Sequence, residues 1–418
     1  MPTDGDHPGG RRGVLIASQW YWPEVAGSAP PVQQMAEILA ADPAVGSVTV
    51  HCARPFYPHR EVLADWRDGR RDDETHTGVT IRRLPMPPPK GAGIRARLGP
   101  ELLFAARLWA RLRRRSTHRD AMTVVAVCPS ILTVVAVAAA LPRRIRRVAV
   151  VHDVQSGLAA SLKLASSGAV LWLLRRVERA ALNRMDEIIT LSPAMTETLR
   201  DLGVRTPVRI VPPTIDDDRI RPRPEPAGPV TLLYSGNVGR KQGLDQLLGM
   251  AEAIRDRALP AQVVIRGDGN YKATLMDHAT ARGLDAVVRF EPFCPPEALA
   301  EGMAAGHVHL VPQDPAGAAF AVPSKIYAIM AAGRPFVCTA VAGSPMDGIR
   351  KAADAFVICP PEDGAALADA VQALIDAPAE RARLGRNGRA YVEATAGKAA
   401  CRAAYRAAVL GHTAQRCG

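Results

Sequence analysis

Short runs of apolar residues alternate along this chain with longer segments in which apolar residues recur at helical spacing. Helical patterns include residues 28–41 and 166–185. The first series of apolar runs lies at residues 13–18, 47–53, 123–128, 147–153 and 187–192. Nearly continuous apolar strands separated by helices are typical of parallel sheets that are covered on both faces.

A second series of apolar runs follows a proline-rich, charged segment at residues 212–229. These runs lie at residues 230–236, 262–269, 287–293, 308–313 and 335–340. The pattern predicts an α/β fold of two Rossmann-like domains, with ligands bound at the carboxyl ends of the strands in a cleft between them. The predicted parts are a disordered leader (1–12), an N-terminal domain (13–211), a linker (212–229), a second domain (230–395) and a C-terminal helix that recrosses to the first domain (396–418).

One apolar stretch, residues 122–142, is long enough to suggest a membrane span. Pro129 and Ser130 divide it into a β-branched run and an alanine-rich run. That division favours a buried strand, a turn and a buried helix, with a spanning helix as the alternative.

Composition narrows the class of protein. Of the 418 residues 48% are hydrophobic and 22% charged, as in a globular chain, and the net charge of +12 suggests an anionic partner. Aromatic residues, at 5%, are not interleaved with the basic runs, which argues against nucleic acid. The seven cysteines form no C-x-x-C pair, so we expect reduced thiols in a cytosolic protein and no bound metal.

A glycine-rich loop follows the first run of the second series. In "YSGNVGRKQG", Gly236 and Gly239 permit a close approach of backbone to a ligand, and Arg240 and Lys241 place two cations beside an expected helix start. The loop matches neither the dinucleotide-binding nor the P-loop motif. A simple turn is the alternative interpretation.

The segment "VPSKIYAIMAAGRP" predicts a short helix with Ser324 as its N-cap and Gly333 as its stop. Lys325 then occupies the first turn, where the helix dipole disfavours a cation by about 0.3–1 kcal/mol. A pyrophosphate held between this turn and the pair Arg240 and Lys241 would explain the placement. A purely structural lysine is the alternative.

An ordered set of motifs resembles the family 4 glycosyltransferases of the GT-B fold along nearly the whole chain. These motifs are "QWYWPEVAGSAPPVQQMAEILA", "VVHDVQ", "DEIITLSPAMTETLRDLGV", "VRIVPPTID", "YSGNVGRKQGLD", "IRGDGNYKATL" and "VPSKIYAIMAAGRP". The combination of "SGNVGRKQG" with "PSK" and "AAGRP" is similar to the branch that builds bacterial exopolysaccharide and O-antigen, including fucosyl- and N-acetylfucosaminyltransferases.

The resemblance implies retaining transfer from a UDP- or GDP-linked sugar, a substrate rather than a permanently bound cofactor. No metal takes part in the chemistry, the second domain binds the donor, and the N-terminal domain binds a polyprenyl-diphosphate-linked or saccharide acceptor. Arg240, Lys241 and Lys325 are implied to hold the diphosphate, and His152 to contact the sugar. A structural histidine is the alternative at position 152. Other implied contacts lie at Gly27, Gly236, Asn237, Gly239, Gly267 and Ser324.

The chain departs from the family at two positions. Much of the family carries two glutamates eight residues apart around the helix at Lys325, and here those positions are Phe320 and Ala328. No role of those glutamates can be transferred to this chain. A silent sugar-nucleotide-binding homologue and a nucleotide-sugar epimerase of GT-B shape therefore stay open beside a transferase.

A basic segment, residues 94–119, suggests where the acceptor is reached. Leu98, Leu102, Leu103, Ala106 and Trp109 share one face of the expected helix, which ends in clustered arginines. This pattern favours an interfacial helix on anionic lipid and a cytoplasmic protein at the inner face of the plasma membrane. A helix packed on the core with a solvated basic end is the alternative.

Overall fold

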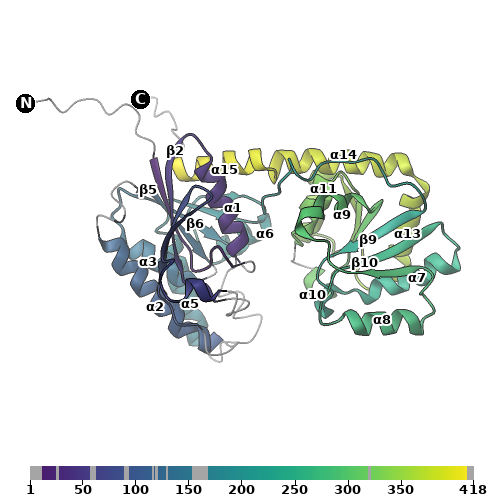
Figure 1. The fold of residues 1–418 in the computed structure, drawn as a ribbon, viewed down its shortest axis with the longest axis horizontal. Helices are drawn as coiled ribbons and strands as arrows, with labels where there is room; N and C mark the ends of the chain where they lie inside the picture. Colours follow the sequence, from purple (N-terminus) through teal and green to yellow (C-terminus); the bar gives the residue numbers. More distant parts are fainter. Residues whose placement is uncertain are drawn as a thin grey trace, which may run out of the picture. The chain divides into compact units, whose positions relative to one another are not determined.

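The chain forms two compact units (Figure 1). Unit 1 takes the residues up to Thr214 and again those from Cys401, and unit 2 is Ile215–Ala400. The computed structural model describes residues 12–24, 28–56, 63–88, 94–114, 117, 121–128, 130–152, 168–318 and 322–411. The predicted leader up to residue 11, Gly27 and Phe320 lie outside these ranges.

Unit 1 is built on a sheet of eight strands in the order β3-β4-β2-β1-β5-β6-β7-β8, parallel except for the β3–β4 pair. The strands are β1 (Arg12–Ala17), β2 (Val45–Ala53), β3 (Asp73–His76), β4 (Val79–Leu84), β5 (Ala121–Cys128), β6 (Arg146–Val151), β7 (Glu187–Thr190) and β8 (Val208–Ile210). The apolar pattern missed β3, β4 and β8. These strands lie at or next to an edge of the sheet, where polar and charged side chains replace the apolar run.

The helices of unit 1 cover both faces of this sheet. Helices α2, α3 and α5 pack on one face, and α1 and α15 on the other (Figure 1). Their bounds are α1 (Ala29–Ala40), α2 (Ile94–Arg113), α3 (Ile131–Ala140), α5 (Gly168–Leu182), α6 (Pro193–Asp201) and α15 (Lys398–Leu410). The apolar stretch 122–142 thus forms most of β5 and the buried helix α3. Among the described helices none is long and apolar enough to cross a membrane.

Unit 2 has a sheet of six parallel strands in the order β11-β10-β9-β12-β13-β14. The strands are β9 (Val230–Ser235), β10 (Ala261–Arg266), β11 (Val288–Glu291), β12 (Val308–Val311), β13 (Phe336–Thr339) and β14 (Phe356–Cys359). The helices are α7 (Asp245–Asp256), α8 (Lys272–Ala281), α9 (Leu299–Ala304), α10 (Pro315–Ala318), α11 (Lys325–Ala331), α12 (Pro345–Ala353), α13 (Gly364–Asp376) and α14 (Pro378–Thr395).

The segment predicted as a linker, residues 212–229, is anchored to unit 2 at several points, although most of residues 221–229 are exposed. Ile220 is buried in the core beside α11 and α14. Arg389 donates to the Ile220 carbonyl at 2.8 Å, and Arg334 donates to the Pro224 carbonyl at 2.7 Å. These contacts use backbone oxygens, so the side-chain pattern of the segment gave no sign of them.

Helix α14 lies directly against the turn that ends α11. Gly333 ends α11 with a positive φ of 65°, as the sequence predicted, and its carbonyl faces Gly385 of α14. A Cβ atom on Gly385 would overlap that carbonyl oxygen, which is backbone and cannot rotate away. Only glycine therefore allows α14 to approach so closely.

We expect Gly385→Ala to lower the free energy of unfolding by about 1–3 kcal/mol, the usual cost of overpacking. Gly249→Ala is the matched control, because Gly249 lies inside α7 with no atom within 4 Å of an added Cβ. That substitution should raise stability by about 0.5–1 kcal/mol through helix propensity. Denaturant unfolding measures both changes. Equal gains in the two variants would show that the contact at Gly385 is not tight.

Candidate functional site

Two glycine-containing loops lie side by side at the carboxyl ends of β9 and β10. The Gly236 N–H donates to the Arg266 carbonyl at 2.9 Å, and the Val238 N–H donates to the Asp268 carbonyl at 2.8 Å. Gly267 has φ 148°, and a Cβ there would overlap the Gly236 carbonyl oxygen. Glycine at 267 is thus required for the two loops to form one backbone ledge, here named the glycine ledge (residues 236–239 and 267–269).

Lys325 projects over this ledge from the first turn of α11. Its Nζ lies 4.0 Å from the ring centroid of Tyr234, and a Cβ on Gly236 would lie 2.7 Å from the same Nζ. No carboxylate in the described part of the chain pairs with this ammonium group, and burial lowers the pKa of Lys325 to about 8. A partly buried cation without a counter-ion is a natural site for a bound anion.

Tyr234 supports both the ledge and the lysine, and sequence reasoning missed it. Its ring is fully buried, and its hydroxyl donates to the Asn237 carbonyl at 2.6 Å. Burial raises the pKa of Tyr234, so the hydroxyl stays neutral and keeps its proton as a donor. The available signal was the single tyrosine of the strand, at its next-to-last position and two positions before Gly236.

Arg240 lies on the far side of the same loop. Its guanidinium group stacks 4.9 Å from the ring centroid of Tyr271, whose hydroxyl donates to Asp245 at 2.8 Å. The helix expected to start at Arg240 is instead a single 3₁₀ turn (Arg240–Gln242), and α7 begins at Asp245. Gly239 precedes this turn in extended conformation, while the side chain of Lys241 lies outside the described atoms.

Ser324 does not cap α11 with its side chain, in contrast to the prediction. Its backbone is already helical, with φ −59° and ψ −25°, whereas a capping hydroxyl requires an extended residue. The Ser324 carbonyl instead accepts from the Tyr327 N–H at 3.3 Å. Ser324 is exposed, so its hydroxyl is not held by the helix that follows it.

His152 belongs to unit 1 and directly follows β6. Its backbone N–H donates to the Cys128 carbonyl at 3.1 Å, and burial lowers the pKa of its imidazole to about 4. The ring is therefore neutral at physiological pH and can offer a hydrogen bond but no charge. In unit 2 Ala328, one of the two positions without a glutamate, lies in α11 and packs against the core.

Comparison with protein families accounts for both units. The family model described as Glycosyl transferase 4-like domain matches residues 26–214, and the model described as Glycosyl transferases group 1 matches residues 216–391. The protein is a glycosyltransferase.

Known proteins agree with this class. The chain is 28% identical over 367 residues to the putative colanic acid biosynthesis glycosyl transferase WcaI of Escherichia coli K12, covering 83% of this chain and 88% of that one. Sucrose-phosphate synthase from Thermosynechococcus elongatus superposes with a TM-score of 0.67 at 20% identity over 94% of this chain and 97% of that chain. Anabaena HepE in complex with UDP-glucose superposes with a TM-score of 0.63 at 15% identity, over 96% of this chain and 100% of that chain. The fold is GT-B.

The buried ammonium of Lys325 predicts a pH dependence of stability. The folded state loses this proton near pH 8 and the unfolded state near 10.5, so the unfolded state binds more protons between these values. The free energy of unfolding should therefore gain a contribution from Lys325 as the pH rises from about 8 to 10.5. Lys325→Met lacks this contribution. It should be the more stable protein at pH 7, by a margin that shrinks towards pH 10.5.

Urea unfolding of both proteins across this pH range measures the margin. The comparison with Lys325→Met cancels the titration of all other groups. A margin that does not change with pH would mean that the ammonium group is well solvated.

Proposed function

We propose that the protein is a retaining glycosyltransferase that moves a sugar from a nucleoside-diphosphate sugar to a lipid-linked or saccharide acceptor in cell-surface polysaccharide synthesis. The observation that carries the proposal is the unpaired ammonium of Lys325 above the glycine ledge. Its relative in Escherichia coli is named for colanic acid biosynthesis, and Anabaena HepE is described in complex with UDP-glucose. UDP and GDP are both candidate nucleotides.

The donor diphosphate would lie on the glycine ledge. Lys325, Arg240 and Lys241 would supply positive charge, and the backbone of Gly236, Asn237 and Gly239 would approach the phosphate oxygens. The resemblance implies the same role for Gly27, which lies outside the described residues. Gly267 acts indirectly by holding the ledge together, and the uncommitted Ser324 hydroxyl can turn to a phosphate oxygen. His152 would offer its neutral imidazole to the donor sugar as a hydrogen-bond partner.

The chemistry then needs little proton transfer from side chains. The bond between the anomeric carbon and the phosphate oxygen breaks, and its electron pair goes to the diphosphate, stabilised by the fixed cations. The acceptor oxygen attacks the oxocarbenium-like carbon from the same face, and its proton passes to a phosphate oxygen. This route retains the configuration without a protein nucleophile. It also uses neither a glutamate at 320 or 328 nor a metal ion.

We expect Lys325→Ala to weaken binding of the donor or lower kcat/KM about ten- to a hundredfold. One charge-assisted hydrogen bond contributes about 1.5–3 kcal/mol, and about 1.4 kcal/mol corresponds to a factor of ten. Lys351→Ala, which removes an exposed lysine of α12, is the charge-matched control and should leave the donor affinity unchanged. Unchanged donor affinity combined with reduced thermal stability would make Lys325 a structural residue.

Products distinguish the alternative activities. Purified protein is incubated with a panel of UDP- and GDP-sugars, with and without a bacterial lipid extract. Labelled sugar that moves to an acceptor supports a transferase, whereas interconversion of donors without acceptor indicates an epimerase. Donor binding without either reaction would indicate a silent homologue.

We also propose that unit 1 lies on the inner face of the plasma membrane. Helix α2 buries Phe104, Leu108 and Leu112, as a core-packed helix does, yet Leu98 and Trp109 on another face are 50% and 43% exposed. Of the predicted face Leu102 and Ala106 are also exposed and Leu103 is half-buried. The helix therefore has an apolar surface beyond the one its core packing requires.

Helix α5 adds a second apolar surface that the sequence reasoning missed. Trp172 and Leu173 are 60% and 56% exposed, and α5 packs against α3, as α2 does. Each exposed tryptophan has a guanidinium near its ring, Arg113 at 5.7 Å from Trp109 and Arg176 at 5.4 Å from Trp172. Aromatic rings beside cations suit the headgroup region of an anionic bilayer.

The double substitution Arg113→Gln with Arg114→Gln should weaken binding to anionic vesicles about thirtyfold at low salt. Each arginine near such a surface contributes about 1 kcal/mol. The control is Arg143→Gln with Arg144→Gln, an exposed pair between α3 and β6. Co-sedimentation with phosphatidylserine vesicles measures the affinity. Binding that is insensitive to salt and equal in the two double variants would contradict the interfacial role of α2.

A further inference from the structure

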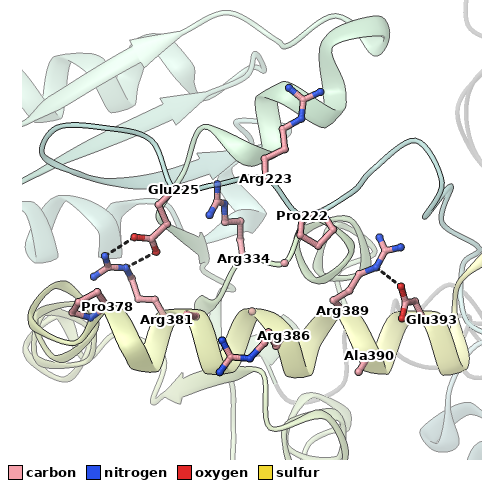
Figure 2. Close-up of a pocket in the computed structure, with 13 residues that line it drawn as sticks. Pro222, Arg223, Glu225, Arg334, Pro378, Arg381, Arg386, Arg389, Ala390 and Glu393 are labelled. Atoms are coloured by element: carbon pink, nitrogen blue, oxygen red, sulfur yellow. Dashed lines mark hydrogen bonds and ion pairs between the residues drawn. The ribbon is translucent and has the colours of Figure 1, made fainter.

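Unit 2 contains a groove of about 540 Å³ that the donor site does not use. Figure 2 shows its walls: the extended segment 222–225, the turn at Gly333 and Arg334, and one face of α14. Arg334 lies just before β13, at the amino edge of the parallel sheet. The glycine ledge follows β9 and β10, at the carboxyl edge. The two sites therefore lie at opposite edges of one sheet. We name this second one the α14 groove.

The α14 groove carries an excess of positive charge. Five arginines and two glutamates line it, a formal excess of three charges. Both carboxylates are already engaged: Arg381 holds Glu225 through two bonds of 2.8 and 2.7 Å, and Arg389 holds Glu393 at 2.6 Å (Figure 2). Among the described residues neither glutamate forms an ion pair with Arg223, Arg334 or Arg386, although the charge of Glu225 still acts on Arg334.

Two of these arginines are fixed in place by carbonyl groups. Arg381 donates to the carbonyls of Leu374 and Ile375 at 2.7 and 3.0 Å, at the end of α13. Arg389 donates to those of Ile220 and Ala331 at 2.8 and 3.0 Å. Guanidinium groups held in this way lose little conformational freedom when an anion binds.

Three further arginines retain donor capacity. Arg334 is 3% exposed, and its Nη2 donates to the carbonyls of Pro224 and Ala304, but its buried Nε has no partner. Arg386 is exposed on α14, and no bond or ion pair engages it within the described residues. Among the described residues Arg223 pairs with Glu301 alone, at 3.4 Å. A buried, unpaired guanidinium N–H is costly and indicates a missing acceptor.

We propose that the α14 groove is a second anion site, which binds a small phosphorylated molecule. Guanidinium groups match phosphate oxygens in pairs, and the apolar walls at Pro222, Pro378, Ala382 and Ala390 suit the uncharged part of such a ligand. The volume lies within the range of small-molecule sites, about 300–1,000 Å³. The site shares no residue with the proposed donor site, so it does not depend on the proposed function.

Inorganic pyrophosphate is the probe, titrated by calorimetry at constant ionic strength. The test variant is Arg223→Gln with Arg386→Gln, since both side chains are exposed and the fold does not need them. The control is Arg257→Gln with Arg282→Gln, two exposed arginines elsewhere in unit 2. Both pairs are compared in the Lys325→Ala background, which weakens the donor site.

We expect the Lys325→Ala protein still to bind pyrophosphate. Adding the groove substitutions Arg223→Gln and Arg386→Gln should lower that affinity at least tenfold, whereas adding the control substitutions should leave it unchanged. Thermal unfolding should show the same pattern, because a ligand that binds only the folded state raises Tm. Pyrophosphate binding that disappears with Lys325→Ala alone would overturn the groove. Equal losses in groove and control variants would also overturn it, because they would indicate non-specific attraction to charge. Loss with Lys325→Ala alone would place the pyrophosphate at the donor site, so neither result would contradict the proposed sugar transfer.

Discussion

The contact on which unit 2 depends most is the approach of two backbone loops beneath a charged side chain. The loop after β9 and the loop after β10 exchange main-chain hydrogen bonds, and the absence of a Cβ at Gly267 lets them touch. Tyr234 then fills the space below and holds the Asn237 carbonyl. Lys325 is placed over this ring by α11, so its ammonium faces polar backbone with no carboxylate nearby in the described chain. Charge, backbone donors and a flat surface meet at one place.

Two other buried cations of unit 2 have hydrogen-bond acceptors around them, and this contrast distinguishes Lys325 from them. Arg381 and Arg334 are 5% and 3% exposed, and each is surrounded by carbonyl oxygens or a carboxylate. These bonds attach the segment 215–225 to α14 and to the turn at Arg334, and so serve the fold. Lys325 has no such partners among the described residues, and burial lowers its pKa to about 8. Apart from the ring of Tyr234, no described side chain pairs with its ammonium group, as expected of a binding residue.

The sequence predicted the parallel sheets because apolar runs mark strands buried on both faces, as at Val124 and Leu232. It missed β14 although that short edge strand is apolar, and it also failed where a strand is polar or a segment is bound through its backbone. Strand β3 is polar because it is an edge, and the segment near Ile220 is bound through its carbonyls. Helix electrostatics and loop composition singled out Lys325 and Gly236 as candidates, and the structure places these two residues close together. Tyr234 was not predicted, because its role comes from its contacts with Lys325 and with the Asn237 carbonyl in the folded structure.

Helix α11 lies between the glycine ledge and the α14 groove, with Lys325 at its start and Gly333 and Arg334 in the turn after its end. It has seven residues, with Lys325 at its first position, and Gly333 follows two positions after its last. Residues on its buried face pack in the core, and its C-terminal turn touches α14 through Gly385. Its seven residues make about two helical turns, so one short element places Lys325 above the glycine ledge, and the turn that follows it places Arg334 in the wall of the α14 groove. The positions of both side chains therefore depend on the packing of the buried face of α11 in the core of unit 2.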